Sequence, residues 1–351
     1  MDATDLALPR GGQQMAALND AQLDIVAALQ VAPRAPTSAL AEILEMPRTT
    51  TARQLQKLLD ANIVRLIGRI AWPLITSGPP SELWIKCHPG HTAAVVEELR
   101  RFREVQFIMV TTGSVDICAH LYPLRGSDVS TLVMSSIPSI SGIASIQTHL
   151  VLKTAKVGQS WRLNRLTGDQ VVALESHTEP VVRQPFTSPD QLSELEWQVL
   201  EQLANDVRVS STDLARRFSV SPSTAYRTVQ TLLQSEAVAP RVEVEPAALG
   251  FGLNVMIALQ VDAGSIPSVL ADLAAHQSSR MVSMVAGTAS VISGGVFRNE
   301  AELSDFITDD IGALRGVHTM NICVSQKILR RYWRERDGFK IGEQIDGILR
   351  R

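Results

Sequence analysis

The stretch LARRFSVSPSTAYRTVQTL, residues 214–232, decides the fold of this chain, because a related stretch stands 174 residues earlier. At this offset Leu40 corresponds to Leu214 and Arg53 to Arg227. In both copies a short apolar helix pattern is followed by a turn and by a second helix whose first outward side chains are short and polar. Such a second helix can enter the major groove of DNA, so the pattern predicts a helix-turn-helix. Matching residues continue far beyond it, which predicts a tandem duplication.

Length and composition predict a folded protein of several domains. The chain has 351 residues, of which 45% are hydrophobic and 20% charged. Its formal charge of −3 means that any nucleic-acid contact must come from a local basic face. Cys87, Cys118 and Cys323 are too few and too widely spaced to predict a disulfide framework or a zinc site. No apolar run approaches the roughly 18 residues of a membrane span, so we expect a cytoplasmic protein without membrane contact.

The pattern along the chain predicts an α+β fold. Strand, helix, strand, strand, helix and strand follow one another in residues 82–153, which is the βαββαβ order of a ferredoxin-like domain. Strand-forming residues around Gly68 predict the hairpin wing that often follows a helix-turn-helix. The predicted segments are a disordered leader (1–15), winged helix-turn-helix domain 1 (16–79), regulatory domain 1 with its tail (80–171), a polar linker (172–190), winged helix-turn-helix domain 2 (191–250) and regulatory domain 2 with its tail (251–351).

The two ferredoxin-like segments are predicted to pair within one chain. A four-stranded sheet covered by two helices on one face leaves its other, apolar face open. We therefore expect residues 82–153 and 256–327 to cover each other and to form a pseudo-dimer, which we expect to assemble further into a homo-oligomer. Similar tails follow each domain, around Trp161 and Trp333. Each tail is expected to pack back on its own sheet.

The second helix of each helix-turn-helix is predicted to bind double-stranded DNA. Three basic residues and no acid lie in residues 46–58, and the same is true of residues 215–232. Arg53 and Arg227 are expected to contact phosphate or a base edge, with the neighbouring polar side chains positioning the helix. The predicted DNA-binding residues are Arg48, Thr49, Thr50, Arg53, Gln54, Lys57, Ser221, Ser223, Thr224, Tyr226, Arg227 and Gln230.

An alternative is a three-helix domain that contacts only other proteins. The second copy leaves more room for this alternative, because acidic residues flank its basic helix and would repel a duplex if they lay on the same face. These flanking acids are Asp206, Asp213, Glu236, Glu243 and Glu245.

Several motifs give the chain a resemblance to a known family. Residues 192–200 form an opening helix, and Ser221-x-Ser223-Thr224-x-x-Arg227 forms the recognition segment. Gly113-x-x-Asp116 stands between the second and third predicted strands, and Gly142-Ile143 and Gly316-Val317 open the last strand of each regulatory domain. Both halves resemble the Lrp/AsnC (feast/famine) transcription regulators. The resemblance implies a nucleoid-associated, sequence-specific DNA-binding regulator with a small effector, commonly an amino acid, between paired regulatory domains.

The second copy departs from the family pattern. Thr228 and Thr231 stand where the family usually has further basic residues, and residues 287–290 lack the acid present at Asp116. The candidate effector-binding residues are Gly113, Ser114, Asp116, Gly287 and Thr288. Asp116 is positioned to bind an effector's ammonium group. The alternative is a tight hairpin in which glycine supplies a positive φ and aspartate caps the turn.

No residue pattern predicts catalysis, a metal site or a cofactor. His88, His91, His120 and His149 lack acids or thiols at ligand spacing, and no dinucleotide or phosphate-loop motif is present. One enzymatic alternative is a siroheme decarboxylase, since those enzymes share the two-domain plan. They are expected to carry histidine-rich and aromatic segments, of which only His120 and Tyr122 stand in a suitable place. A further alternative is a ligand-sensing or protein-interaction module that has lost DNA binding.

Overall fold

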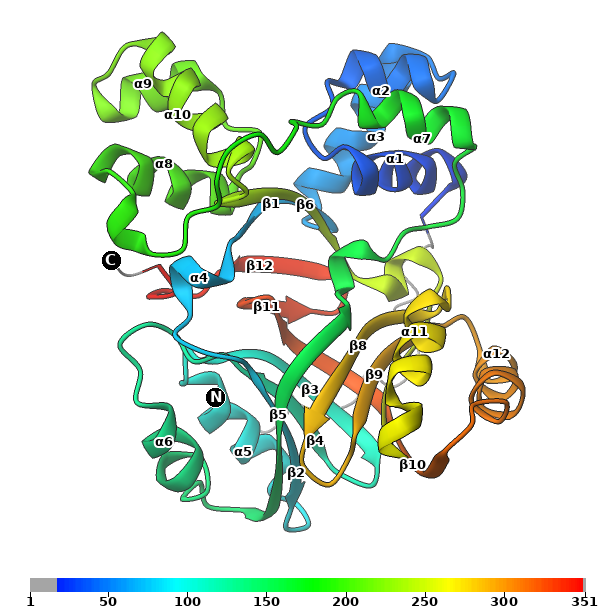
Figure 1. Ribbon diagram of the computed structural model, residues 1–351. Helices are drawn as coiled ribbons and strands as arrows, with labels where there is room; N and C mark the ends of the chain where they lie inside the picture. The colour runs from blue at the N-terminus through cyan, green and yellow to red at the C-terminus, as the bar shows by residue number, and fades with distance from the viewer. Residues whose placement is uncertain (1–17, 350–351) are drawn as a thin grey trace. The chain divides into compact units, whose positions relative to one another are not determined.

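A computed structural model describes residues 18–349 of the chain (Figure 1). The predicted leader, residues 1–15, lies outside the described residues. The chain divides into two compact units, which we treat separately. The sheet unit comprises residues 78–161 and 246–338, and the helical unit comprises residues 18–77, 162–245 and 339–349. Within residues 18–349, no helix has the length and apolar character needed to cross a membrane.

The helical unit contains the two predicted helix-turn-helix motifs (Figure 1). Each begins with a capped helix: the Asn19 side chain accepts from the backbone of Gln22, and the Ser193 side chain accepts from the backbone of Glu196. The first copy consists of α1 (Asp20–Val31), α2 (Thr37–Ile43), α3 (Arg48–Asp60), β1 (Val64–Ile70) and α4 (Trp72–Ile75). The second consists of α8 (Glu194–Asn205), α9 (Ser211–Phe218), α10 (Pro222–Gln234) and β6 (Val238–Val244). Helix α7 (Gly168–Glu175), a 3-10 turn (Pro189–Gln191) and β12 (Lys340–Gln344) complete this unit.

The duplication extends to individual backbone angles. Glu45 and Ser219, at equivalent positions in the turn before the second helix of each motif, both have a left-handed φ, of 53° and 55°. Asn62 and Glu236, which are equivalent positions after that helix, have φ of 54° and 53°. Left-handed non-glycine residues are uncommon, so their recurrence at the same places means that both copies keep the same turns. The two predicted helix-turn-helix folds are confirmed.

The predicted hairpin wing is wrong. Residues 64–70 form one continuous strand, β1, and its partner is the equivalent strand of the other copy, β6. The two strands pair antiparallel, with Val64 opposite Val244 and Ile70 opposite Val238. Gly68 lies in this ribbon where the backbone of α8 approaches closely, which explains the glycine without a hairpin turn.

Replacing Gly68 by alanine is expected to destabilise the helical unit by about 1–3 kcal/mol, because the new methyl group overpacks the ribbon. Its Cβ would overlap the side chain of Val238 and lie 2.6 Å from the carbonyl oxygen of Leu203. Urea denaturation followed by circular dichroism measures the change. Gly168→Ala is the matched control, because nothing lies within 4 Å of the added methyl group there. Equal stability of the two variants would contradict this role of Gly68.

The sheet unit contains two βαββαβ motifs, as predicted. The first consists of β2 (Ser81–Cys87), α5 (Thr92–Arg100), β3 (Val105–Gly113), β4 (Ile117–Leu121), α6 (Val129–Thr131) continued by a π turn (Leu132–Ser136), and β5 (Ile143–Lys156). The second consists of β7 (Leu253–Val261), α11 (Ile266–Ala275), β8 (Ser279–Ala286), β9 (Val291–Phe297), α12 (Glu300–Asp305) continued by a π turn (Phe306–Ile311), and β10 (Val317–Arg331), followed by β11 (Arg334–Asp337). Short 3-10 turns occupy Gly158–Ser160, Pro246–Leu249 and Ala263–Ser265.

The strands of the two motifs join into one closed sheet. Their order is β11-β10-β3-β4-β2-β5-β8-β9-β7, and β10 pairs with β7 as well as with β3. The long last strand of each motif therefore pairs with a strand of the other motif, through bulges that bend it from one sheet to the next. The prediction of two sheets packed face to face did not include these edge-to-edge joins.

Three hydrophobic cores hold the sheet unit together. Two lie between each four-stranded sheet and its own helices, around Leu99 in the first motif and Leu273 in the second. The third contains inward residues of both motifs, including Trp84, Met256 and Ile292. This shared core supports the predicted pseudo-dimer, because each sheet covers the other's apolar face.

The tails also pack differently from the prediction. The indole N–H of Trp333 donates to the carbonyl oxygen of Arg103 at 2.7 Å, and that of Trp161 donates to the carbonyl oxygen of Gln277 at 2.9 Å. Arg103 and Gln277 are equivalent positions, and each belongs to the motif that does not carry the tryptophan. The expectation that each tail packs on its own sheet is therefore wrong: each tryptophan is bonded to the other motif.

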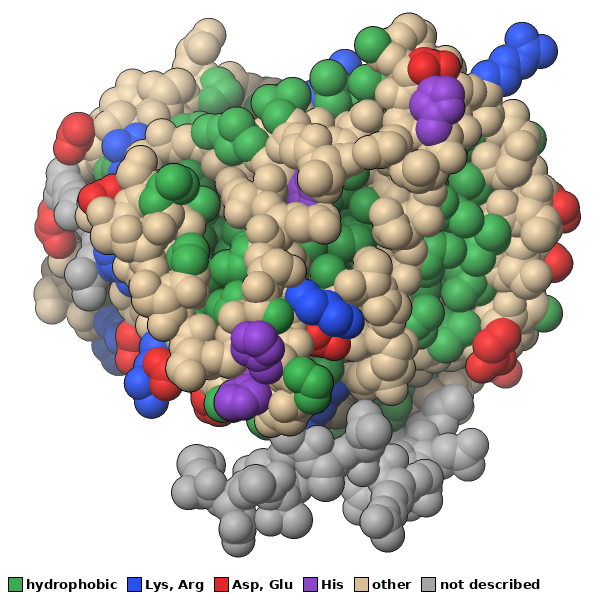
Figure 2. Space-filling view, turned by 90° about the horizontal axis from the view of Figure 1, so that it is seen from below, with side chains coloured by type: hydrophobic (Ala, Val, Ile, Leu, Met, Phe, Trp, Pro, Cys, Tyr) green, Lys and Arg blue, Asp and Glu red, His purple; other side chains and the backbone are tan. Residues whose placement is uncertain are grey.

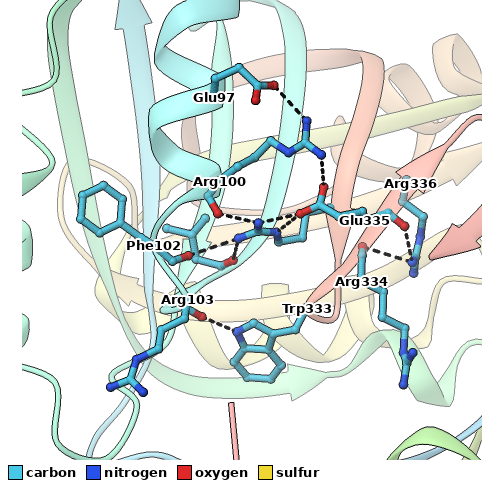
Figure 3. Close-up of polar contacts among 10 residues, drawn as sticks. Glu97, Arg100, Phe102, Arg103, Trp333, Arg334, Glu335 and Arg336 are labelled. Carbon is cyan, nitrogen blue, oxygen red and sulfur yellow. Dashed lines mark hydrogen bonds and ion pairs between the residues drawn. The ribbon is translucent and has the colours of Figure 1, made fainter. Parts of the chain in front are cut away.

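A buried arginine accompanies Trp333. Arg330 is 2% exposed and donates to the carboxylate of Glu335 at 2.6 and 2.8 Å, and to the carbonyl oxygen of Arg100 at 2.7 Å. Further N–H groups reach the carbonyls of Val105 and Phe102. Figure 3 shows the Glu335 carboxylate between two guanidinium groups. The guanidinium of Arg100 supplies the second contact, at 2.9 Å. The end of the second motif is thereby fixed to the α5–β3 turn of the first.

Candidate DNA interface and effector site

Helix α3 presents a basic face to solvent. Its apolar stripe is buried against the rest of the motif, through Leu55 and Leu58. On the opposite side Arg48, Thr49, Arg53 and Lys57 are exposed, while Thr50 and Gln54 are half-buried. The predicted basic and polar side chains of the first copy are thus available to a partner.

Helix α10 presents a less basic face. The Ser221 hydroxyl accepts from the backbone N–H of Thr224 at 3.1 Å and so caps the N-terminus of the helix. Ser223, Thr224 and Arg227 are exposed and Gln230 is half-buried. Tyr226 is 56% exposed, which is unusual for a large aromatic side chain. Its exposed ring suits contact with a partner.

Of the five acids that flank α10, three are paired or buried, while Asp206 and Glu236 are exposed. Asp213 pairs with Arg216 at 3.0 Å. Glu243 and Glu245 are 1% and 4% exposed, and the Glu243 carboxylate pairs with Arg241 at 2.6 Å. Buried carboxylates repel a phosphate backbone less than free ones on the surface, so Glu243 and Glu245 count less against DNA binding by the second copy than the sequence alone indicates, whereas Asp206 and Glu236 still count against it.

Basic side chains are sparse on the face of the molecule that Figure 2 shows. The face shown in Figure 2 carries scattered Lys and Arg side chains, with apolar side chains in between, and no basic patch. This agrees with a net charge of −3, which requires any DNA contact to be local.

A cavity of about 140 Å³ lies in the sheet unit between the two βαββαβ motifs. Two predicted effector residues, Ser114 and Thr288, line it from equivalent loops. Their neighbours there also come in equivalent pairs, Trp84 with Ala258 and Gln147 with Asn321. The cavity therefore lies where the two motifs meet, and the Thr288 hydroxyl crosses this boundary to donate to the Gln147 side chain at 3.1 Å.

The other predicted effector residues surround this cavity without lining it. Gly113 has φ +124° and lies against the backbone of β10, so a side chain there would collide with Ile322. Gly287 lies against the ring of His149. The Asp116 carboxylate accepts from the backbone N–H of Cys87 at 2.8 Å and lies 3.6 Å from the Lys86 ammonium. The positive φ of Gly113 matches the hairpin interpretation, whereas the Asp116 carboxylate bonds the neighbouring strand β2 and does not cap the turn; the effector role of both residues stays a prediction.

A buried polar row crosses the inner face of the first motif. His120, Glu82 and His149 lie opposite one another on β4, β2 and β5. The Nε2 of His120 lies 3.9 Å from the Glu82 carboxylate, and Phe107 packs on the His120 ring. No hydrogen-bond partner is found for Glu82 Oε2 or either ring nitrogen of His149 among the described residues. These residues stand far apart in the sequence, and the row forms only because the alternation of side chains along β2 and its neighbours brings them to one face.

Burial sets the charge of this row. Desolvation raises the pKa of Glu82 from 4.5 to about 8, although the nearby Trp84 indole opposes the rise. Desolvation, with the nearby charge of Arg331, lowers the pKa of His120 from 6.5 to about 3. Both groups are therefore neutral near pH 7, and their contact is not an ion pair.

The row predicts a particular pH dependence of stability. A carboxyl group whose pKa is higher in the folded chain stabilises the fold fully below about pH 4.5, and loses about 1.4 kcal/mol per unit as pH rises toward 8. His120 acts in the opposite sense, since its stabilisation is lost as pH falls from 6.5 toward 3. Glu82→Gln is expected to remove most of the loss between pH 5 and 8, as measured by urea denaturation at both values. Parallel pH profiles for the variant and the parent would refute the burial of a protonated Glu82.

Comparison with known families places domains on this geometry. Residues 83–161 match the Lrp/AsnC ligand binding domain. Residues 18–65 match a winged helix-turn-helix DNA-binding family, and residues 197–240 match the IclR helix-turn-helix domain. Each matched helix-turn-helix contains one of the two exposed helix faces described above.

Curated relatives match one half of the chain. The HTH-type transcriptional regulator FL11 of Pyrococcus abyssi is 24% identical over 140 residues, which cover 40% of this chain and 92% of FL11. The HTH-type transcriptional regulator AldR of Mycolicibacterium smegmatis is 25% identical over 126 residues, which cover 35% of this chain and 74% of AldR. These relatives thus correspond in length to one helix-turn-helix motif plus one βαββαβ motif, and this chain contains two of each.

Solved structures of one protein match both halves of the chain. The crystal structure of the siroheme decarboxylase NirDL covers 88% of this chain and 92% of its own, with a TM-score of 0.57 and 12% sequence identity. At this identity the likeness is one of fold. It agrees with a chain that contains two helix-turn-helix motifs and two βαββαβ motifs.

Proposed function

We propose that this chain, a tandem-duplicated member of the Lrp/AsnC family, is a sequence-specific DNA-binding regulator of transcription. The observation that carries the proposal is that both recognition helices, α3 and α10, keep an exposed arginine at the same position, Arg53 and Arg227, on a face with no role in the core. An exposed arginine on a helix of this kind can contact phosphate or a guanine edge. The matched helix-turn-helix families and the named relatives support the same function.

The regulator is proposed to respond to a small effector bound between its paired regulatory domains. The cavity lined by Ser114 and Thr288 supports this, because it lies between the two motifs and near both predicted loops. An amino acid is the effector class that the family resemblance implies. We further propose a cytoplasmic, nucleoid-associated protein whose single chains assemble into a homo-oligomer.

The experiment that tests this function is the recovery of DNA bound to the chain across the genome, followed by gel shifts on the recovered sites with candidate amino acids. The expected result is enrichment of a shared sequence motif, and release or tightening of the complex by at least one amino acid. DNA recovered without any shared motif would indicate instead a sensing or protein-interaction module that has lost specific DNA binding.

A siroheme-decarboxylase-like enzyme is the second candidate. The buried row of His120, Glu82 and His149 favours it, because buried polar groups without partners often belong to a functional site. Against it, the cavity of about 140 Å³ is close in size to one that holds benzene, far smaller than a tetrapyrrole. Titration of the chain with siroheme distinguishes the candidates. A saturable shift of the tetrapyrrole absorbance would favour the enzyme.

A further inference from the structure

The two recognition helices are held in a fixed, two-fold related arrangement. Strands β1 and β6 are equivalent segments, and their antiparallel register is centred on Ile67 opposite Arg241. Two equivalent strands that pair in this way are related by a two-fold axis through the centre of the pair. Each strand also packs on the first helix of the other copy, β1 on α8 and β6 on α1. In Figure 1 the ribbon lies between the two helix groups.

A reciprocal pair of arginines strengthens this arrangement. Arg34 donates to the carbonyl oxygen of Val207 at 2.5 Å, and the equivalent Arg208 donates to the carbonyl oxygens of Pro33 and Ala35, both at 2.7 Å. Charge-assisted hydrogen bonds of this length are among the stronger polar contacts in proteins. Because an arginine of each copy is hydrogen-bonded to a loop of the other copy, the two recognition helices are fixed relative to each other within the helical unit.

The two exposed faces nevertheless differ in chemistry. Arg48 and Lys57 of α3 are replaced by Pro222 and Thr231 at the equivalent positions of α10. Conversely, the exposed ring of Tyr226 stands where α3 has only Ala52. Three basic residues therefore face outward on α3, while Arg227 is the only basic residue within α10.

We infer that one chain reads an asymmetric operator, made of two unlike half-sites in inverted orientation. This rests on the proposed function. The α3 half-site contains guanines, because arginine bonds in bidentate fashion to the guanine edge. The α10 half-site has fewer guanines, because Arg227 is its one arginine, and it is rich in thymine, whose methyl group suits the Thr224 and Tyr226 side chains. A single polypeptide with a two-fold frame and unlike faces orients itself in one direction on such a site.

Selection of duplexes from a random library by the full-length chain tests the sequence part of the inference. The expected product has two different half-sites, inverted and separated by whole helical turns of about 10.5 base pairs each. A perfectly palindromic product would overturn the inference while leaving DNA binding intact. A product without any enriched motif would instead count against the proposed function.

Tethered cleavage tests the orientation. The native cysteines Cys87, Cys118 and Cys323 are buried, so an iron chelate attached to a new cysteine near the surface labels one place. Asp60, which is exposed, and Gln234, which is half-buried, are equivalent positions at the ends of α3 and α10, outside the predicted DNA-binding residues, and are changed to Asp60→Cys and Gln234→Cys. Cleavage by the Asp60→Cys probe is expected beside the α3 half-site only. Cleavage by the Gln234→Cys probe is expected beside the α10 half-site only. Equal cleavage at both half-sites by each probe would overturn a fixed orientation.

Discussion

Replacing Arg53 and Arg227 together by alanine is expected to weaken operator binding by roughly 30-fold to 10⁴-fold. Each arginine in contact with DNA contributes about 1–3 kcal/mol, and each 1.4 kcal/mol is a factor of ten in affinity. Both side chains are exposed and serve no core contact, so the fold and the oligomeric size are expected to stay unchanged. Fluorescence anisotropy on a recovered operator measures the loss.

The matched control for this variant is Arg101→Ala with Arg315→Ala. Both of these arginines are exposed and lie in the sheet unit, so the control removes the same charge away from the recognition helices. Equal affinity of the Arg53/Arg227 variant and the parent would remove these residues from the DNA interface. Equal weakening by the control would indicate a non-specific effect of charge.

Arg330→Ala is expected to destabilise the sheet unit by about 3–5 kcal/mol, because the truncation leaves three backbone carbonyls without this donor and leaves Glu335 with Arg100 as its remaining partner. The buried guanidinium holds Glu335 of its own motif and three backbone carbonyls of the other. The equivalent residue of the first motif, Lys156, makes a single bond of 2.9 Å to the carbonyl oxygen of His276 and is half-buried. Lys156→Ala is therefore expected to cost no more than about 1 kcal/mol.

Urea denaturation of both variants, followed by tryptophan fluorescence, measures this difference. The fluorescence of Trp333 reports directly on the surroundings of Arg330, because the Trp333 indole N–H donates a hydrogen bond to the nearby carbonyl oxygen of Arg103. Similar midpoints for the two variants would contradict the unequal roles given to Arg330 and Lys156.

The helices, the strands and the duplication were predictable from the sequence, because hydrophobic periodicity and a constant 174-residue offset are visible in the sequence alone. Both helix-turn-helix motifs and both βαββαβ motifs lie where they were expected. The joins between copies were not predictable in the same way. Trp161 and Trp333 were visible as a repeated pair, but their acceptors are backbone carbonyls of residues 277 and 103, which any residue type supplies.

The ribbon between β1 and β6 shows a second limit. A strand-forming segment with a central glycine is compatible with a hairpin and with a straight strand whose neighbour approaches closely, and only the partner strand distinguishes the two. The reciprocal bonds of Arg34 and Arg208 were detectable in principle, since both arginines share the 174-residue offset. Their meaning depended on knowing that the copies face each other.

The candidate sites were predictable to different degrees. Exposed faces of α3 and α10 followed from helical periodicity, since the residues opposite the apolar stripe must face outward. The effector site did not follow, because Ser114 and Thr288 line one cavity only when the two motifs are paired. Burial of the row around Glu82 likewise depends on a second sheet that covers it.

The salt dependence of operator binding by the purified full-length chain tests the central claim most directly. Arg216 is exposed but pairs with Asp213. Five further exposed basic residues of the two motifs form no ion pair among the described residues: Arg48, Arg53, Lys57, Arg217 and Arg227. If all of them neutralise phosphates, the logarithm of the binding constant falls against the logarithm of salt concentration with a slope of about −4 to −5. We predict this slope with one chain per operator, and tighter binding than to a random duplex. A slope near zero, or equal affinity for operator and random DNA, would contradict sequence-specific DNA binding through both recognition helices.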